Sequence, residues 1–165
     1  MIQLSDSDLR RAAADGMDAF INLFADAYLG ALGGTLTADN MALLSAPQHT
    51  LLAYRILRDE LMEGGFCQLI QNGWGPYILH NPVARALREW GIPAVPAVLN
   101  AARRIYDQHR ADLERERSDD DFMAMYEQYE QFDPLEEQFL DAEEEATEAV
   151  ARHVDQHLQD FAEIV

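Results

Sequence analysis

Apolar residues recur at steps of three and four along most of this chain, which is the spacing of amphipathic α-helices. Ser5 and Ser118 each precede such a run and carry a side chain that caps helix N-termini. No segment alternates apolar and polar residues for long enough to predict a strand. The expected helices cover residues 5–32, 37–63, 81–90, 118–132 and 134–161, and a long helix begins at Pro93 or Pro96 and ends at Arg117.

The length and apolar content of the chain fit one hydrophobic core. The chain has 165 residues, of which 48% are hydrophobic, and a domain of this size can bury enough apolar surface for a stable fold. The sequence therefore predicts an all-α fold, a single-domain multi-helix bundle over residues 1–165. Within it we expect a core of near-neutral charge over 1–117. A strongly acidic C-terminal pair of helices, over 118–165, would pack on that core.

Negative charge is concentrated toward the C-terminal end. The chain has 30 acidic residues against 12 basic ones, all of them Arg, and a net charge of -18. Residues 1–117 hold 14 acids and 11 Arg, whereas residues 118–165 hold 16 acids and one Arg. This balance argues against binding to nucleic acid or to an anionic membrane, because attraction to phosphate dominates both. It favours a basic partner such as a nucleic-acid-binding protein or a cationic peptide, or a divalent metal.

The acids of this segment form two groups with different explanations. Those at 119–121, and those at 133, 136 and 137 around Pro134, fall in the first turn of a predicted helix, where the helix dipole favours each carboxylate by about 0.3–1 kcal/mol. Those from 137 to 148 form a stripe with no basic residue before Arg152. Like charges four residues apart cost about 0.2–0.5 kcal/mol per pair, so helix stability does not explain the stripe.

The spacing of the acids from Glu136 to Glu148 resembles that of phosphates. Seven acids lie between Glu136 and Glu148, over about 20 Å of helix. One charge per roughly 3 Å is close to the one per about 3.4 Å of a single DNA strand. We expect these carboxylates to stand in for phosphates against Arg and Lys of a partner. The predicted partner-binding residues are Asp119, Asp120, Asp121, Glu137, Asp141, Glu144, Glu145 and Glu148.

Two further features could suggest catalysis or metal binding. His153 and His157 are four residues apart, with Asp160 one turn further, a spacing that can present a metal site on one helix face. Histidines near a helix C-terminus also interact favourably with the dipole, which accounts for this pair without a metal. Cys67 lacks the flanking motif of a nucleophile. We therefore predict no catalytic residue, no cofactor, no metal and no enzymatic activity.

The sequence also bears on the compartment. Residues Met1–Arg11 lack the apolar run of a signal peptide, and no stretch of 18 apolar residues is present. A single cysteine fits a reducing environment. We expect a soluble, cytoplasmic protein.

A short motif resembles that of a known family. Residues 64–75 read Gly-Gly-Phe-Cys-Gln-Leu-Ile-Gln-Asn-Gly-Trp-Gly. This string resembles the Gly-Gly-Phe-x-Gln…Asn…Gly motif of a widespread bacterial helical domain of unassigned function, over roughly residues 45–117. The whole chain, with its acidic end, is similar to the neisserial DNA-mimic family built on that domain. The matching positions are Gly64, Gly65, Phe66, Gln68, Asn72 and Gly75.

The resemblance implies a homodimeric, all-helical protein whose surface carboxylates bind a helix-turn-helix transcription factor and keep it off its operator. The motif is not catalytic. From the residues we expect a helix end at Gly64-Gly65, a core aromatic at Phe66, and side-chain amides that satisfy backbone groups. The alternative is an acidic inhibitor or immunity-type protein that blocks a basic enzyme such as a nuclease. A metal-dependent or cysteine enzyme is a third hypothesis.

Overall fold

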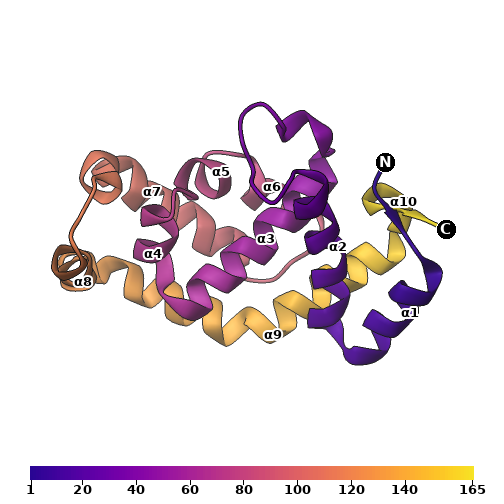
Figure 1. Ribbon diagram of the computed structural model, residues 1–165. Helices are drawn as coiled ribbons and strands as arrows, with labels where there is room; N and C mark the ends of the chain where they lie inside the picture. The colour runs from indigo at the N-terminus through magenta and orange to yellow at the C-terminus, as the bar shows by residue number, and fades with distance from the viewer. The chain divides into compact units, whose positions relative to one another are not determined.

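The computed structural model describes all residues, 1–165, and it is built almost entirely of helices (Figure 1). The all-α prediction is confirmed. The elements in chain order are β1 (Gln3–Leu4), α1 (Asp6–Asp15), α2 (Met17–Ala31), η1 (Met41–Leu43), α3 (Ala46–Glu63), α4 (Gly65–Gln71), α5 (Gly75–Leu79), α6 (Val83–Glu89), α7 (Val95–Glu114), α8 (Asp119–Gln128), η2 (Glu130–Phe132), α9 (Asp133–Gln156), α10 (Leu158–Phe161) and β2 (Glu163–Ile164).

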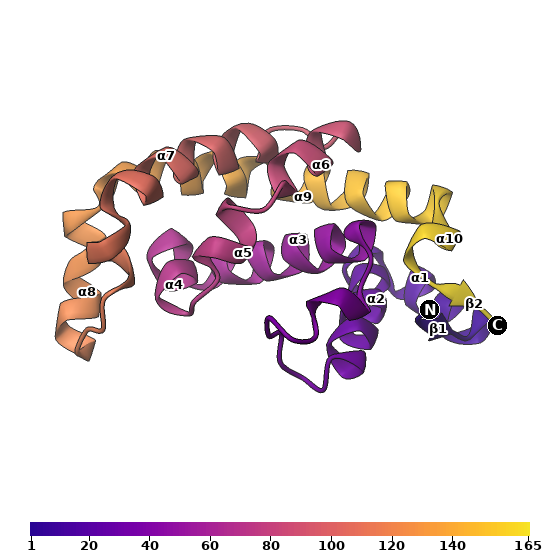
Figure 2. The same cartoon turned by 90° about the horizontal axis from the view of Figure 1, so that it is seen from above.

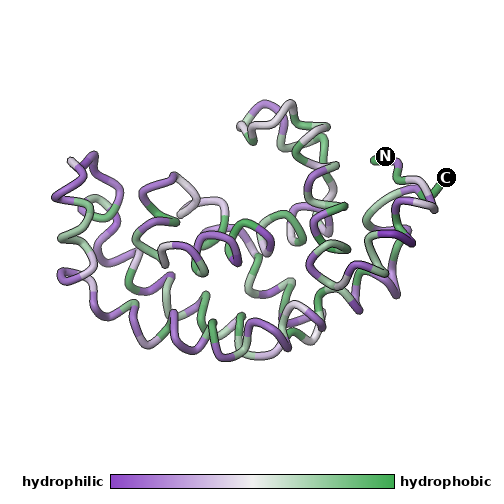
Figure 3. The backbone as a smooth tube through the Cα atoms, turned by 60° about the horizontal axis from the view of Figure 1, so that its bottom comes forward, coloured by the Kyte–Doolittle hydropathy of each residue, from purple (hydrophilic) through white to green (hydrophobic).

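The helices are amphipathic, as the apolar spacing predicts. Figure 3 shows hydrophilic and hydrophobic segments alternating along the backbone of the longer helices. The chain forms two compact units: unit 1 is Met1–Arg55 with Thr147–Val165, and unit 2 is Ile56–Ala146. Helices α3 and α9 each contribute residues to both units. Whether the whole chain folds as one domain stays a prediction.

Unit 1 is organised around the aromatic side chains of α2 and α10. Phe24 and Phe161 are fully buried, and their ring centroids lie 6.5 Å apart. The backbone carbonyl of Phe161 accepts hydrogen bonds from the Tyr28 hydroxyl at 2.8 Å and from Gln48 Nε2 at 3.0 Å. Buried polar groups are stable only when paired, so these contacts hold the end of the chain against α2 and α3.

A two-residue parallel pairing in unit 1 was not predicted. Gln3 pairs with Glu163 and Leu4 with Ile164, which brings the two ends of the chain together (Figure 2). Segments this short have no period that a sequence pattern can reveal.

Unit 2 holds the motif and the acidic helices. Helix α7 packs against α4, α5 and α6, and the ring centroids of Phe66 and Phe132 lie 5.3 Å apart in the core. The acidic part of α9 turns Phe139 and Ala146, both fully buried, toward this core. Helix α8 lies at one end of the unit, crosswise to α9, as Figures 1 and 2 together show.

Several expected helix boundaries differ from those in the structure. The first expected helix is divided by Gly16, at φ 122°, into α1 and α2. The second begins at Ala46 instead of Thr37, because Ser45 and Gln48 form the reciprocal cap: the Ser45 N–H donates to Gln48 Oε1 at 2.8 Å. The last is interrupted at His157, beyond which α10 is a separate short helix.

Candidate partner-binding surface

The first group of predicted carboxylates lies in the first turn of α8. Ser118 Oγ accepts a hydrogen bond from the Asp121 N–H at 3.2 Å, which confirms the predicted cap. Asp119, Asp120 and Asp121 are all exposed, and none makes an ion pair. The positive end of the α8 dipole stabilises them in place of a counterion.

The second group lies on α9, on the face opposite its buried residues. Glu137, Asp141, Glu144 and Glu145 are exposed, and none of them has an ion-pair partner. Glu148 continues the stripe in the part of α9 that belongs to unit 1. It is exposed and pairs with Arg152 at 2.8 Å. Four carboxylates of unit 2 therefore face solvent without compensation.

Two neighbouring acids of α9 have structural roles instead. Glu143 pairs with Arg58 of α3 at 2.5 Å, and the two side chains are only 15% and 18% exposed. The Glu136 carboxylate accepts a hydrogen bond from the Phe66 N–H at 3.3 Å, and burial raises its pKa. The seven acids counted between 136 and 148 in the sequence thus include two that hold the fold of unit 2.

Each acidic helix of unit 2 also exposes one large apolar side chain. Met123 of α8 is 64% exposed and Leu140 of α9 is 51% exposed. Leu140 lies three residues after Glu137 and four before Glu144, so it shares their face of the helix. A surface for phosphate-like contacts alone has no need of such residues, whereas protein interfaces combine an apolar centre with a polar rim.

The connection between α7 and α8 is fixed by side chains. Gln71 Nε2 donates to the carbonyls of Leu113 at 2.6 Å and Arg115 at 3.0 Å. The Tyr129 hydroxyl donates to the Asp112 carboxylate, and this bond, with those of Arg115 and Arg117, lowers the pKa of Asp112 to about 2. The start of α8, with its three aspartates, is therefore held in place by residues of α4, α7 and the α8–η2 junction.

The motif residues surround two half-buried carboxylates. Gln68 and Asn72 both donate their side-chain amides to Glu60, at 2.9 and 3.0 Å. The prediction that these amides satisfy backbone groups is therefore wrong: they bind a carboxylate one helix earlier. Gly65 has φ +79°, and a Cβ there would lie 2.4 Å from Glu136 Oε1.

Two other motif positions pack against aromatic residues. A Cβ on Gly75 would lie 2.7 Å from the ring of the fully buried Tyr106. Phe66 is fully buried, as predicted, and the Gly64 carbonyl accepts from the Tyr126 hydroxyl at 2.9 Å. The motif residues thus form the turn into α4 and allow the start of α5 to pack closely against Tyr106. They contribute no exposed reactive group.

The structure gathers no metal-binding cluster of three or more His, Cys, Asp or Glu side chains. The rings of His153 and His157 stack with centroids 4.2 Å apart, and His157 Nδ1 lies 2.7 Å from the His153 carbonyl. Burial and the neighbouring His157 lower the pKa of His153. No helix in the chain is both long and apolar enough to span a bilayer.

Cys67 is buried in α4, and we expect its thiol to be inert in the folded protein. Burial, reinforced by Glu136 and Asp133, raises its pKa to about 12, so almost no thiolate forms at neutral pH. Labelling with a thiol reagent at pH 7.5 should be at least about a hundredfold slower in the native protein than in urea. Equal rates in the two states would contradict the structure.

This fold and surface define a class of acidic, all-helical proteins that present unpaired carboxylates from two helices. The chain belongs to the DMP19-like protein family, whose model matches residues 42–157. It is also similar to the DNA mimic protein DMP19 of Neisseria meningitidis serogroup B (strain ATCC BAA-335 / MC58), with 36% identity over 127 residues, which cover 76% of this chain and 77% of that protein. The expected resemblance to the neisserial DNA-mimic family is confirmed.

Proposed function

We propose that this protein is a DNA mimic whose carboxylates occupy the DNA-binding surface of a helix-turn-helix transcription factor and block operator binding. The similarity to a protein named as a DNA mimic supports the general role. The unpaired carboxylates on α9 carry the proposal, because they are the groups that a phosphate-binding surface would contact.

The spacing of these carboxylates supports mimicry of a DNA strand. Once the structural acids Glu136 and Glu143 are set aside, four unpaired carboxylates remain from Glu137 to Glu145, nine residues of continuous helix. Nine residues account for about 13.5 Å of helix, or one charge per about 3.4 Å, the phosphate spacing along one DNA strand. Excluding the structural acids therefore keeps the match that the sequence indicated.

A helix-turn-helix factor is the partner class that we favour. Such proteins use Arg, Lys and backbone N–H groups to contact phosphates on both sides of the recognition helix, so an acidic helix can compete for the same surface. Many of these factors are two-fold symmetric, and we propose that this protein acts as a homodimer. The role is that of a binding protein in transcription regulation, without catalysis.

The proposal is tested by capture from a lysate of the source organism, followed by a competition assay. We expect a basic DNA-binding regulator to be captured and its operator duplex to compete with this protein for it. The affinity should fall by about tenfold or more between roughly 50 and 200 mM salt, because exposed charges are screened. Capture of a nuclease would support the inhibitor hypothesis instead, and binding alongside operator DNA would contradict mimicry.

The exposed leucine of the acidic face gives a separate prediction. Replacing Leu140 by Ala should weaken partner binding by about five- to tenfold, because the residue lies among the predicted contacts and its burial stabilises a protein complex. The salt dependence should not change, since no charge is altered. The matched control is Met62→Ala, also in unit 2 and 51% exposed but outside the acidic helices. Equal effects of the two changes would contradict a specific role for Leu140.

A further inference from the structure

Helix α7 is kinked at His109, where the backbone leaves the helical conformation (φ -127°, ψ 18°). Sharp kinks usually occur at proline, at glycine or serine, or where a side chain or water enters the hydrogen-bond ladder. The segment 104–114 contains no Pro, Gly or Ser, and most of its residues are good helix formers. The local sequence therefore favours a straight helix, and contacts between side chains must hold the kink.

One of these contacts joins two residues of α7 on opposite sides of the kink. The hydroxyl of Tyr106 donates to Glu114 Oε2 at 2.5 Å, and the Tyr106 side chain is fully buried. On a straight helix eight residues rise about 12 Å. A helical tyrosine also leans toward the N-terminus, which is away from Glu114. The bond is therefore specific to the kinked form of α7.

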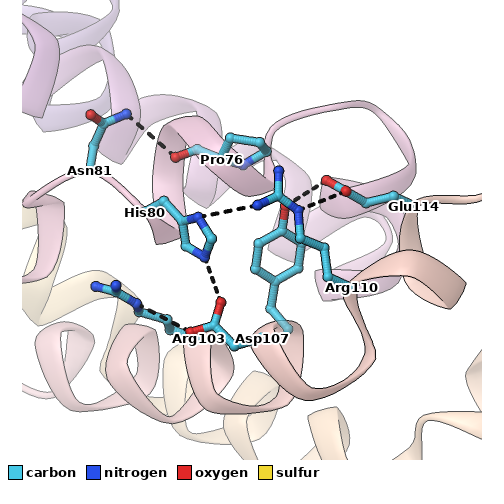
Figure 4. A network of polar contacts seen from close by, with 8 residues as sticks. Pro76, His80, Asn81, Arg103, Asp107, Arg110 and Glu114 are labelled. Carbon is cyan, nitrogen blue, oxygen red and sulfur yellow. Dashed lines mark hydrogen bonds and ion pairs between the residues drawn. The ribbon is translucent and has the colours of Figure 1, made fainter.

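His80, the residue that follows α5, bridges the kink from outside the helix. Its Nε2 lies 2.5 Å from the Asp107 carboxylate, before the kink, and its Nδ1 lies 3.5 Å from the Arg110 guanidinium, after the kink. Figure 4 shows His80 between Asp107 and Arg110, with Glu114 beyond Arg110. These four side chains are 30–47% exposed, so the contacts between them are of modest strength.

Beyond the kink the chain carries a buried cation that is only partly satisfied. The Arg117 side chain is 0% exposed, and its Nη2 donates to the carbonyl and the carboxylate of Asp112, at 2.7 and 3.0 Å. Its Nε and Nη1 are buried and have no hydrogen-bond partner. A buried donor without an acceptor is destabilising, and more so on a charged group. The kinked form therefore carries a cost at Arg117.

Helix α8, which begins two residues after Arg117, is free to follow the end of α7. Met125 is its only buried residue, and the Tyr126 hydroxyl donates to the Gly64 carbonyl at 2.9 Å. Elements with few buried apolar contacts open at low free energy, and moving parts of proteins are drawn from them. A change of direction in the last turn of α7 would therefore carry α8 and its three aspartates with it.

We propose that His109 is a hinge in α7, and that straightening of this helix gives α8 a second position relative to α9. The partly exposed contacts of Figure 4 hold the kinked form, and hydration of the Arg117 guanidinium favours the straight one. Two positions of α8 give two spacings between its aspartates and the α9 carboxylates, which lets one chain fit basic surfaces of different width. This use rests on the proposed function, whereas the hinge itself does not.

The test measures the distance across the hinge in the full chain, without a partner, by double electron–electron resonance. Spin labels at Arg104→Cys in α7 and Glu127→Cys in α8 replace two exposed side chains, while Cys67 is buried and stays unlabelled. We expect a main distance and a second one whose population grows about tenfold in Tyr106→Phe, because a hydrogen bond to a carboxylate is lost. A single distance, the same in both proteins, would overturn the proposal.

Hydrogen exchange compares this variant with a matched control. In Tyr106→Phe the amides of residues 110–128 should exchange about tenfold faster, whereas those of α9 should keep their rates. Tyr28→Phe removes a similar bond in unit 1, from a buried hydroxyl to the Phe161 carbonyl, and should leave residues 110–128 unaffected. Equally faster exchange throughout unit 2 in Tyr106→Phe would indicate general destabilisation and would overturn the hinge.

Arg117→Met should have the opposite effect. Methionine is unbranched and lacks the unpaired donors, and Asp112 keeps Arg115 and Tyr129 as partners, so the kinked form should gain stability. The second distance should lose population, and residues 110–128 should exchange at least about threefold more slowly. Faster exchange would overturn the role given to Arg117. Because every measurement uses the free chain, failure of the hinge is distinguishable from failure of the proposed function.

Discussion

Reversing two charges on α9, with Asp141→Lys and Glu144→Lys together, is expected to weaken partner binding by more than about a hundredfold. Both carboxylates are exposed and unpaired, so each change replaces an attraction to a basic surface with a repulsion. Close charge pairs at protein interfaces can couple by about 1.5–7 kcal/mol, which makes a loss of this size reasonable for two reversals. The measurement is displacement of operator DNA from the partner, followed at fixed ionic strength.

The same double variant should keep or gain stability. Asp141 lies four residues from both Glu137 and Glu145, and Glu144 lies four residues before Glu148. Each like-charge pair on one helix costs about 0.2–0.5 kcal/mol, and the reversal converts these pairs into favourable ones. An unchanged or higher Tm with lost binding would show that α9 gives up stability for function.

The control carries the same change in net charge on unit 1. Asp15→Lys with Asp39→Lys alters two exposed acids that make no ion pair and lie outside α8 and α9. We expect at most a small loss of affinity from the altered overall field. If the control loses as much affinity as the α9 variant, net charge and not the stripe determines binding.

The second large effect is expected from Gly65→Ala, which should destabilise the protein by about 3 kcal/mol. A left-handed conformation costs a non-glycine residue about 1–2 kcal/mol, and Gly65 has φ +79°. The new methyl group would also displace the Glu136 carboxylate from the Phe66 N–H, and a buried group left unpaired costs about 1–3 kcal/mol. For a chain of this size the Tm should fall by about 6–12 °C.

Gly73→Ala separates the two causes. Gly73 has φ +87°, nearly the same conformation as Gly65, but nothing lies within 4 Å of a Cβ built there. Its substitution should therefore show the conformational cost alone, a fall in Tm of about 2–8 °C. Equal losses at the two positions would mean that Glu136 does not contribute to the turn into α4.

Local signals in the sequence predicted the helical class and some boundaries well. Ser118 Oγ caps α8 and Ser5 Oγ caps α1, because capping depends on residues three positions apart. The Ser45–Gln48 capping box is an equally local signal, whereas the helix expected to start at residue 37 rests on Thr37 and Asn40. That pair does make reciprocal hydrogen bonds, the shorter at 2.8 Å, yet it closes a turn and not a helix.

Contacts between distant residues could not be predicted in the same way. The exposed acids of α9 were foreseen from their periodicity, but nothing near Glu143 in sequence indicates that Arg58, 85 residues away, neutralises it. Glu136 and Glu60 are likewise identified as structural only by the motif residues that contact them. The number of acids in a helix therefore overestimates the number of carboxylates available to a partner. Some of these acids bind an arginine or a backbone N–H within the fold, as Glu143 and Glu136 do.

The absence of lysine acquires a practical meaning once the α9 carboxylates are known to be unpaired. All 12 basic side chains are Arg, which do not form amides with activated carboxylates. Carbodiimide coupling of a complex would therefore join acids of this chain to lysines of the partner, with no lysine here to react in the opposite direction. In every side-chain cross-link the carboxylate would then come from this chain and the lysine from the partner. A cross-link at Glu137, Asp141, Glu144 or Glu145 would show which partner lysine lies beside that position of α9.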